Sequence, residues 1–318
     1  MKLSIILTVF NKEPFLHRVF NSLLSQENTQ DGDYEVIVVN DGSTDGSAAI
    51  IEKFANLHSC IQVITQSNQG LSMARNNGVA IAKGEYVWYI DADDSIASDS
   101  VVSILEATKT QPDLIPIYAE TDGKIAIRNK IPTSVRTGRD ILLSQVWSHC
   151  APFYIYRRSF LNDYNLHFLP NIYHEDSELT PRLLWHVRSV VVIPKVLYHV
   201  YCDLNSITQI PRLKRAYDNV LIAENHYIFS REHVPELDVS LRQVYDSLIS
   251  LLLNNALSII CLYNKKEQLK FNELLYKKQF LFQSLCRASS IKYHIEGFFF
   301  KIFPNRYVSI YQLMKGRW

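Results

Sequence analysis

The first hundred residues alternate short apolar runs with stretches of helical periodicity. Buried strands are predicted at Leu3–Val9, Tyr34–Val39, Ile61–Thr65 and Glu85–Ile90, and the segments between them space their apolar residues as helices do. Strands of this length that alternate with helices are typical of a sheet whose strands are joined by crossover helices. The pattern therefore predicts an α/β fold with a doubly wound sheet.

Side chains able to bind ligands stand where three of these strands end. Thr8 and Asn11 close the first strand, Asp41 closes the second, and Asp91–Asp94 follow the fourth. In open α/β sheets, ligands bind beyond the carboxyl ends of the strands. We therefore expect these residues to share one site.

Beyond Pro112 the strand pattern loosens. Helices are predicted at 138–146 and 176–186, strands at 190–193 and 196–198, and a loop or ribbon at 124–132. From about Leu213 onward helical periods dominate. We expect one α/β domain over residues 1–210, with halves of about 1–110 and 111–210, and a mainly helical region over 211–318.

Composition excludes a disordered chain, because 47% of the 318 residues are hydrophobic and 20% are charged. The 33 basic and 32 acidic residues give no chain-wide attraction to nucleic acid. The charge is uneven, however. Residues 265–318 hold 11 basic and three acidic residues, a net of +8, whereas residues 1–264 carry a net of −7. The end of the chain is expected to meet something anionic.

The five cysteines are scattered and form no CxxC pair, which disfavours a disulfide framework or a zinc ribbon and fits a reducing compartment. The apolar run near the N-terminus is too short for a secretory signal. The apolar segment 248–263, interrupted by Asn254 and Asn255, falls short of a membrane span. We expect a cytoplasmic protein.

Three carboxylates gather in Asp91-Ala92-Asp93-Asp94. Like charges this close are costly unless a cation neutralises them. Mg²⁺ or Mn²⁺ prefers oxygen ligands and also binds phosphate oxygens, so the pattern fits a metal–diphosphate site. A solvated turn, or a helix cap by Asp94 or Ser95, would give the same sequence.

Asp41-Gly42-Ser43-Thr44-Asp45 follows the second strand. Ser43 or Thr44 is expected to cap the next helix, and Asp41 is placed to accept a hydrogen bond from a nucleobase. Thr8 and Phe10 could offer a hydroxyl and an aromatic face to the same base. The chain contains no G-x-G-x-x-G, which argues against a nicotinamide-dependent oxidoreductase.

Five segments in order now resemble one family. They are Ser4–Asn11, Val38–Asp45, Asn68–Gly78, Gly84–Asp94 and His174–Asp176. Their sequence resembles that of the family 2 glycosyltransferases, over roughly residues 1–210. The resemblance implies a GT-A fold with a doubly wound mixed sheet, a nucleotide-sugar donor and a Mn²⁺ or Mg²⁺ cofactor.

The resemblance also implies roles for particular residues. Asp176 matches the general base and Glu175 precedes it; a helix cap is the structural alternative for Asp176. The residues that match metal contacts are Asp93, Asp94 and His199. A histidine of the core or of the surface is the alternative for His199. The residues that match nucleotide contacts are Thr8, Phe10, Asn11, Asp41, Arg75, Asp91 and Ala92.

The chain departs from the family pattern at Phe10 and at His174. Phe10 replaces the usual tyrosine and offers no hydroxyl, and His174 replaces the usual glycine before Glu-Asp. Arg75 could equally be a surface helix arginine. Asn205–Thr208 resembles a stretch that follows the last strand in the family.

The tail from Ile291 to Trp318 interleaves aromatic and basic residues. Such a tail suits an interfacial helix on an anionic membrane, and it equally suits a helix docked on the rest of the protein with its lysines in water.

We predict an inverting glycosyltransferase that moves a sugar, expected to come from a UDP-sugar, to a saccharide or lipid-linked oligosaccharide in cell-surface polysaccharide synthesis. It would act in the cytoplasm, with possible contact to the inner face of the plasma membrane and none to nucleic acid. A non-catalytic nucleotide-sugar-binding subunit and a nucleotidyltransferase are the alternatives. The latter typically has a glycine-rich loop after the first strand, where this chain has Val9–Pro14 without glycine.

Overall fold

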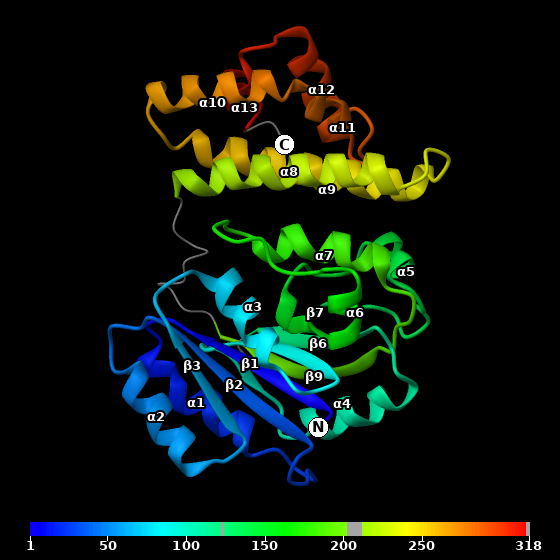
Figure 1. Ribbon diagram of the computed structural model, residues 1–318. Helices are drawn as coiled ribbons and strands as arrows, with labels where there is room; N and C mark the ends of the chain where they lie inside the picture. Colours follow the sequence, from blue (N-terminus) through cyan, green and yellow to red (C-terminus); the bar gives the residue numbers. More distant parts are fainter. Residues whose placement is uncertain (122–123, 202–211, 316–318) are drawn as a thin grey trace. The chain divides into compact units, whose positions relative to one another are not determined.

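The computed structural model describes residues 1–121, 124–201 and 212–315. The chain forms two compact units, one of Met1–Asn171 with Glu175–Leu204 and one of Ile172–His174 with Asn205–Trp318 (Figure 1). The expected boundary near residue 210 and the Asn205–Thr208 segment both fall in 202–211, outside the described residues.

A single sheet organises the first unit, with strand order β3-β2-β1-β4-β8-β6-β9-β5 and β7 paired with β6. The first four strands are parallel, and β8 runs antiparallel to β4 and β6. This is the mixed, doubly wound sheet that the sequence predicts. The strands are β1 Leu3–Val9, β2 Tyr34–Asp41, β3 Ile61–Gln66, β4 Tyr86–Asp91, β5 Ser95–Ile96, β6 Leu114–Thr121, β7 Lys124–Arg128, β8 Tyr154–Arg157 and β9 Ile193–Val200.

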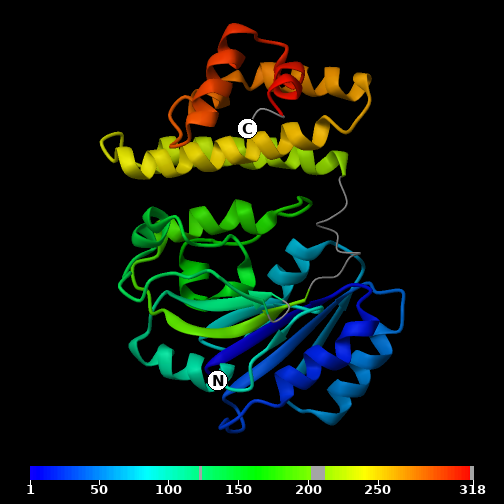
Figure 2. The same cartoon turned by 180° about the vertical axis from the view of Figure 1, so that it is seen from behind.

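Helices cover both faces of the parallel strands, with α3 on one face and α1 and α2 on the other (Figures 1 and 2). The close approach of α3 to the sheet depends on Gly78, since a Cβ there would lie 2.4 Å from Ile6 Cγ2. The helices of this unit are α1 Glu13–Leu24, α2 Ser47–Leu57, α3 Leu71–Ile81, α4 Ser100–Ala107, α5 Gly138–Ser144, α6 Arg158–Asp163 and α7 Glu175–His186.

Two local predictions were wrong. The strand expected at 196–198 is part of β9, but of the strand expected at 190–193 only Ile193 belongs to β9, and Val190 makes an isolated bridge. Neither Ser43 nor Thr44 caps α2, which begins after Gly46 without a side-chain cap. Both residues bond to Asn11 instead, because Asn11 Oδ1 accepts from Thr44 N at 2.7 Å and Ser43 Oγ accepts from Asn11 N at 3.1 Å.

The second unit is helical, as the sequence predicts. Its buried core is apolar and aromatic, and it includes Ala223, Leu253, Phe271, Leu285 and Phe300. None of the described helices is long and apolar enough to cross a membrane. The helices are α8 Leu213–His233, α9 Val239–Ile260, α10 Lys265–Lys277, α11 Phe282–Leu285, α12 Ile291–Ile302 and α13 Tyr307–Met314.

We predict that Gly78→Ala destabilises the first unit by up to about 2 kcal/mol. The added methyl group collides with Ile6 on a buried strand, at a cost of about 1–3 kcal/mol, and the better helix propensity of alanine offsets about 1 kcal/mol of it. Urea unfolding measures the loss. Gly46→Ala is the matched control, because its Cβ would meet the movable end of the Glu13 side chain. Equal losses in both variants would contradict the steric explanation.

Candidate active site

Strand register brings the predicted site residues to one edge of the sheet. Thr8 on β1 pairs with Val39 on β2 and with Asp91 on β4, so the carboxyl ends of the three strands are level. The chain runs from β1 to β2 on one side and returns to β4 on the other. This reversal is the switch point at which open α/β sheets bind ligands.

A buried arginine lies at the centre of this edge. Arg75 on α3 is 3% exposed, and it donates from Nη2 to Asp91 Oδ1 at 2.9 Å and from Nη1 to Glu175 Oε1 at 2.8 Å. The alternative of a surface helix arginine is therefore excluded. One guanidinium joins the end of β4 to the start of α7. Glu175, its partner on α7, lies 100 residues beyond Arg75 in the sequence.

Burial and charge oppose each other within this trio. Burial alone would lower the pKa of Arg75, but the charges of Asp91 and Glu175 raise it above its usual value. Burial raises the pKa of Glu175 to about 7, with Arg75 opposing and the charge of Asp176 adding to the rise. Burial likewise raises the pKa of Asp91 against the pull of Arg75. The single positive charge of Arg75 is therefore surrounded by more carboxylates than it can neutralise.

Asp176 lies close enough to this trio for its charge to act on Arg75 and Asp91. Its side chain is half-buried, and its Oδ1 accepts a hydrogen bond from Ser177 N at 2.7 Å. The structure therefore brings the predicted base to the same edge as the aspartate cluster. Cys150 is also near, since Asp176 contributes, after burial, to the raised pKa of its thiol.

The aspartates at the end of β4 have different partners. Lys12 Nζ lies 2.5 Å from Asp93 Oδ2, whereas Asp94 accepts from the Tyr198 hydroxyl at 2.6 Å and from Tyr201 N at 2.9 Å. Burial raises the pKa of Asp94 to about 7, the charge of Asp91 adds to the rise, and the two hydrogen bonds oppose it. The backbone of this turn is held by Arg18, which donates to the Asp93 carbonyl.

The sequence predicts a metal contact for His199 and gives no role to its neighbour Tyr198, which is the residue that contacts Asp94. His199 pairs with Ser95 in the sheet, yet its Nδ1 lies 2.8 Å from Glu120 Oε1. Tyr198, one residue earlier, reaches Asp94 and also accepts from Asp91 N at 3.2 Å. Successive side chains on a strand point to opposite faces, so alternation separates Tyr198 from His199 but does not show which of the two faces Asp94.

The predicted base-binding residues lie around the ends of β1 and β2. Phe10 is 41% exposed, while Thr8 and Ala92 are buried. Asp41 Oδ1 accepts from Gln66 Nε2 and Gln69 N, each at 2.8 Å, and its Oδ2 accepts from Gly70 N at 2.9 Å. Asp41 is therefore fixed in orientation, with its Oδ2 holding a single bond.

Within the described parts of the chain, no three His, Cys, Asp or Glu side chains are grouped so as to hold a metal ion. A Mg²⁺ or Mn²⁺ ion that binds phosphates needs only one or two protein carboxylates, because phosphate oxygens and water complete its shell. Asp93 offers such a carboxylate, although its Oδ2 is now paired with the Lys12 ammonium, which a metal ion would have to displace.

Comparisons with known proteins agree on one family. The family described as "Glycosyl transferase family 2" matches residues 4–165. The uncharacterized glycosyltransferase EpsJ of Bacillus subtilis (strain 168) is 31% identical over 246 residues, which is 70% of each chain.

Two solved structures share the fold. TarS 1–349 of Staphylococcus aureus, solved in complex with UDP-GlcNAc, has a TM-score of 0.78 at 19% identity over 100% of this chain and 92% of that one. The mannosyltransferase PcManGT from Pyrobaculum calidifontis, solved with GDP-Man and Mn²⁺, has a TM-score of 0.57 at 15% identity over 98% and 86%.

We predict that Glu175→Gln changes how stability depends on pH. The folded state of the wild type holds this proton up to about pH 7, whereas the unfolded chain releases it near the ordinary glutamate pKa of 4.5. The folded state binds more protons between these values, so the wild-type free energy of unfolding falls as pH rises through that window. The fall due to this group should be about 1–3 kcal/mol and absent from the variant.

Urea unfolding at intervals from pH 5 to pH 8 tests this, with Glu52→Gln on the exposed side of α2 as the control. The control should retain the wild-type slope. If Glu175→Gln also retains it, the burial of an excess of carboxylates around Arg75 does not set the pKa of Glu175.

Proposed function

Because this chain belongs to glycosyltransferase family 2, we propose that it transfers a sugar from a UDP-sugar to a hydroxyl group of a saccharide acceptor, with inversion at the anomeric carbon. The family itself rests on the match to residues 4–165 and on the relation to EpsJ. The chain is thus a glycosyltransferase. The observation that carries the finer proposal is the Arg75 trio, which sets Glu175 and Asp176 beside the aspartates at the end of β4.

The two acidic residues that open α7 would have separate tasks. Glu175 is buried and its Oε1 is engaged by Arg75. Asp176 is half-buried, and within the described residues its Oδ2 accepts no hydrogen bond, so Asp176 is the carboxylate available to an acceptor. In the proposed step, Asp176 takes the proton of the acceptor hydroxyl, the oxygen bonds to the anomeric carbon, and the bond from that carbon to the diphosphate breaks.

The donor nucleotide would lie across the ends of β1 and β2. Asp41 would accept from the base N–H, with the Thr8 hydroxyl and the exposed ring of Phe10 beside it. The side chain of Asn11 joins the loops after these two strands and so would shape the site. Crystal structures of TarS with UDP-GlcNAc and with UDP support a uridine donor.

Asp91 and Ala92 would border the ribose, and Arg75 would fix Asp91 in place. Asp93 and Asp94 would hold Mn²⁺ or Mg²⁺, a cation that neutralises the departing diphosphate when bound. Lys12, now paired with Asp93, is free to turn to a phosphate once that pair is broken. His199 stays a predicted metal ligand, with Glu120 orienting its ring.

We propose that the acceptor is a saccharide or a lipid-linked oligosaccharide of a cell-surface polysaccharide, reached from the cytoplasm at the inner face of the plasma membrane. Relatives include a poly(ribitol-phosphate) β-glucosyltransferase of Bacillus spizizenii, which supports a polymer acceptor. The described cysteines, Cys60, Cys150, Cys261 and Cys286, are all free, in keeping with a reducing compartment.

The principal alternative is a non-catalytic subunit that binds nucleotide-sugar without transferring it. It would use the same donor residues and would have no need of Asp176. Substitution of Asp176 therefore separates the two functions.

We predict that UDP binds with measurable heat in calorimetry when Mn²⁺ is present, and that Asp93→Ala loses the metal-dependent part of the affinity. Asp93 would be the carboxylate nearest the diphosphate and its cation. Asp163→Ala, an exposed aspartate at the end of α6, is the control and should bind as the wild type does. Metal-dependent binding that survives in Asp93→Ala would remove Asp93 from the site, and no UDP binding by folded wild type would exclude the uridine donor.

We predict that Asp176→Asn lowers sugar transfer by at least about 100-fold while leaving UDP affinity unchanged, since an amide cannot accept the acceptor's proton. Release of UDP in the presence of acceptor and donor measures transfer, and calorimetry measures binding. Asp163→Asn should retain both. Loss of UDP binding in parallel with transfer would show that Asp176 holds the donor and is not the base.

A further inference from the structure

Helix α12 is buried on one side and carries large apolar residues on the opposite, exposed side. On its inner side, Gly297 and Phe300 are buried, and the Phe300 ring lies 5.0 Å from that of Phe282 and 5.4 Å from that of Tyr307. This side packs into the core of the helical unit. A helix that is docked in this way normally turns polar residues outward.

The outer side of α12 carries large apolar residues instead. They fall at i, i+4, i+7, i+8 and i+11, which is one stripe of a helix, and we call them the α12 stripe: Ile291, Ile295, Phe298, Phe299 and Ile302. Ile291 is 73%, Phe298 59% and Ile302 49% exposed. An exposed apolar stripe of this kind marks a surface that binds a partner.

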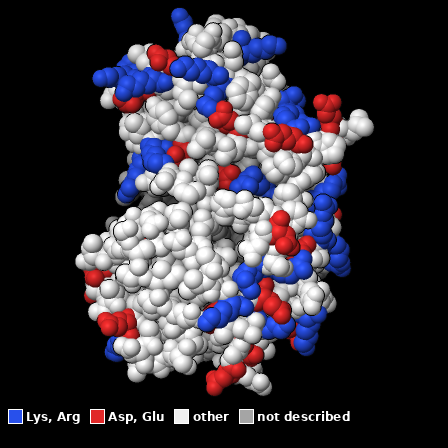
Figure 3. Space-filling model, viewed as in Figure 1, with Lys and Arg blue, Asp and Glu red and all other residues white. Residues whose placement is uncertain are grey.

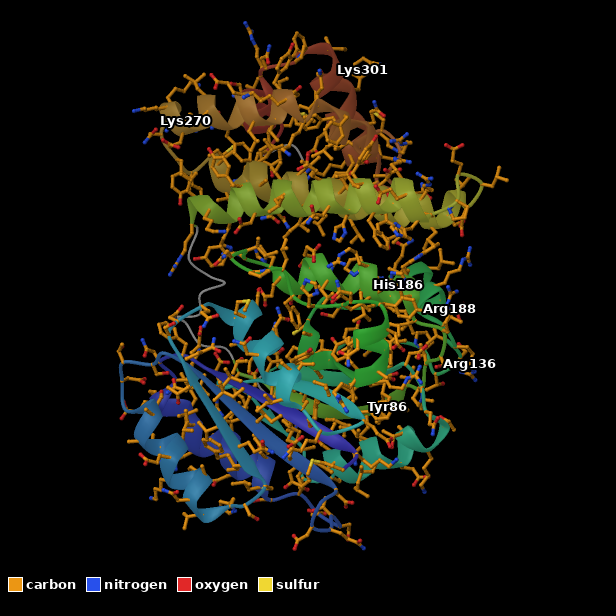
Figure 4. The ribbon with its side chains drawn as sticks, in the orientation of Figure 1. Tyr86, Arg136, His186, Arg188, Lys270 and Lys301 are labelled. Atoms are coloured by element: carbon orange, nitrogen blue, oxygen red, sulfur yellow. The ribbon has the colours of Figure 1, made fainter. Side chains whose placement is uncertain are left out.

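Basic residues flank the α12 stripe. Lys292 and Lys301 lie on either side of it by helical position, and Arg306 and Lys315 follow on the next segment. Beyond Glu296 the chain contains no acidic residue. Figure 4 shows Lys270 on α10 and Lys301 on α12 at the outer surface of the helical unit, and Figure 3 shows basic side chains among uncharged ones there.

We propose that the α12 stripe is a membrane-docking surface, which inserts into the interfacial layer of an anionic bilayer while the flanking lysines contact lipid phosphates. A helix of 12 residues is about 18 Å long, well short of the roughly 30 Å hydrocarbon core, so α12 would lie along the surface. Bulky apolar residues edged by lysines are the composition of such interfacial helices.

The charge distribution along the chain also favours an anionic bilayer as the partner of α12. Residues 265–318 carry a net of +8, and residues 1–264 a net of −7. An anionic surface therefore attracts the segment that carries α12.

A second copy of this chain fits the stripe less well. Two-fold pairing of α12 with itself would bring the lysine-lined edges of the two helices together, and like charges that face each other are destabilising. A membrane-docking surface fits the proposed lipid-linked acceptor. The observations that support this surface do not involve the donor site.

Sedimentation with vesicles of equal parts phosphatidylcholine and phosphatidylglycerol tests the proposal. The wild type should bind these vesicles, bind pure phosphatidylcholine vesicles at least about tenfold more weakly, and be released by salt. Phe298→Ser with Ile302→Ser should lower the partition coefficient by at least about tenfold. Leu237→Ser with Val239→Ser, two exposed apolar residues of the same unit, should leave it unchanged.

Circular dichroism and UDP calorimetry show that each variant is folded and that the donor site is intact, so failure here is distinct from failure of the proposed function. Equal binding by the stripe variant and the wild type overturns the proposal, as does failure of the wild type to bind anionic vesicles. Sedimentation velocity in which the stripe substitutions dissociate a dimer, with no vesicle binding, assigns the stripe to a second copy of the chain.

Discussion

The buried guanidinium of Arg75 is the interaction on which the catalytic edge depends. A buried charge is tolerated only when it is paired, and Arg75 finds its partners on two other elements, Asp91 at the end of β4 and Glu175 at the start of α7. Phe168 adds a ring 5.1 Å from the guanidinium carbon. Removal of the arginine would leave both carboxylates without their shared cation, so Arg75 is the link between the end of β4 and the start of α7.

The same pairing explains why neighbouring acidic residues can behave differently. Glu175 accepts a hydrogen bond from Arg75 and is withdrawn from solvent, whereas Asp176, one position later on the helix, is half-buried. The N-terminus of α7 favours negative charge on both through the helix dipole. For Glu175 that preference is outweighed by burial and by the charge of Asp176, which raise its pKa. The contrast between the two carboxylates arises from position, because their residue chemistry is nearly the same.

Much of the fold was predictable because it depends on local patterns: apolar runs set the strands, and the polar residues at their ends set the site. The pairing of Arg75 with Glu175 was not, since no local pattern links residues 100 positions apart. The predicted cap of α2 was wrong for a related reason, because Ser43 and Thr44 form hydrogen bonds with Asn11, which follows a neighbouring strand. Where a tertiary partner competes with a local role, the sequence alone shows only the local one.

The tail shows another limit of sequence patterns. Interleaved aromatic and basic residues are compatible both with a docked helix and with a membrane helix. The structure separates two faces. Docking accounts for Phe300, which is buried, and leaves Phe298 and Ile302 exposed between lysines. The inner face of α12 packs into the core of the unit, and the outer face has no such role. Exposed apolar side chains of this kind mark a surface that binds a partner. The net charge of +8 over residues 265–318 favours an anionic partner.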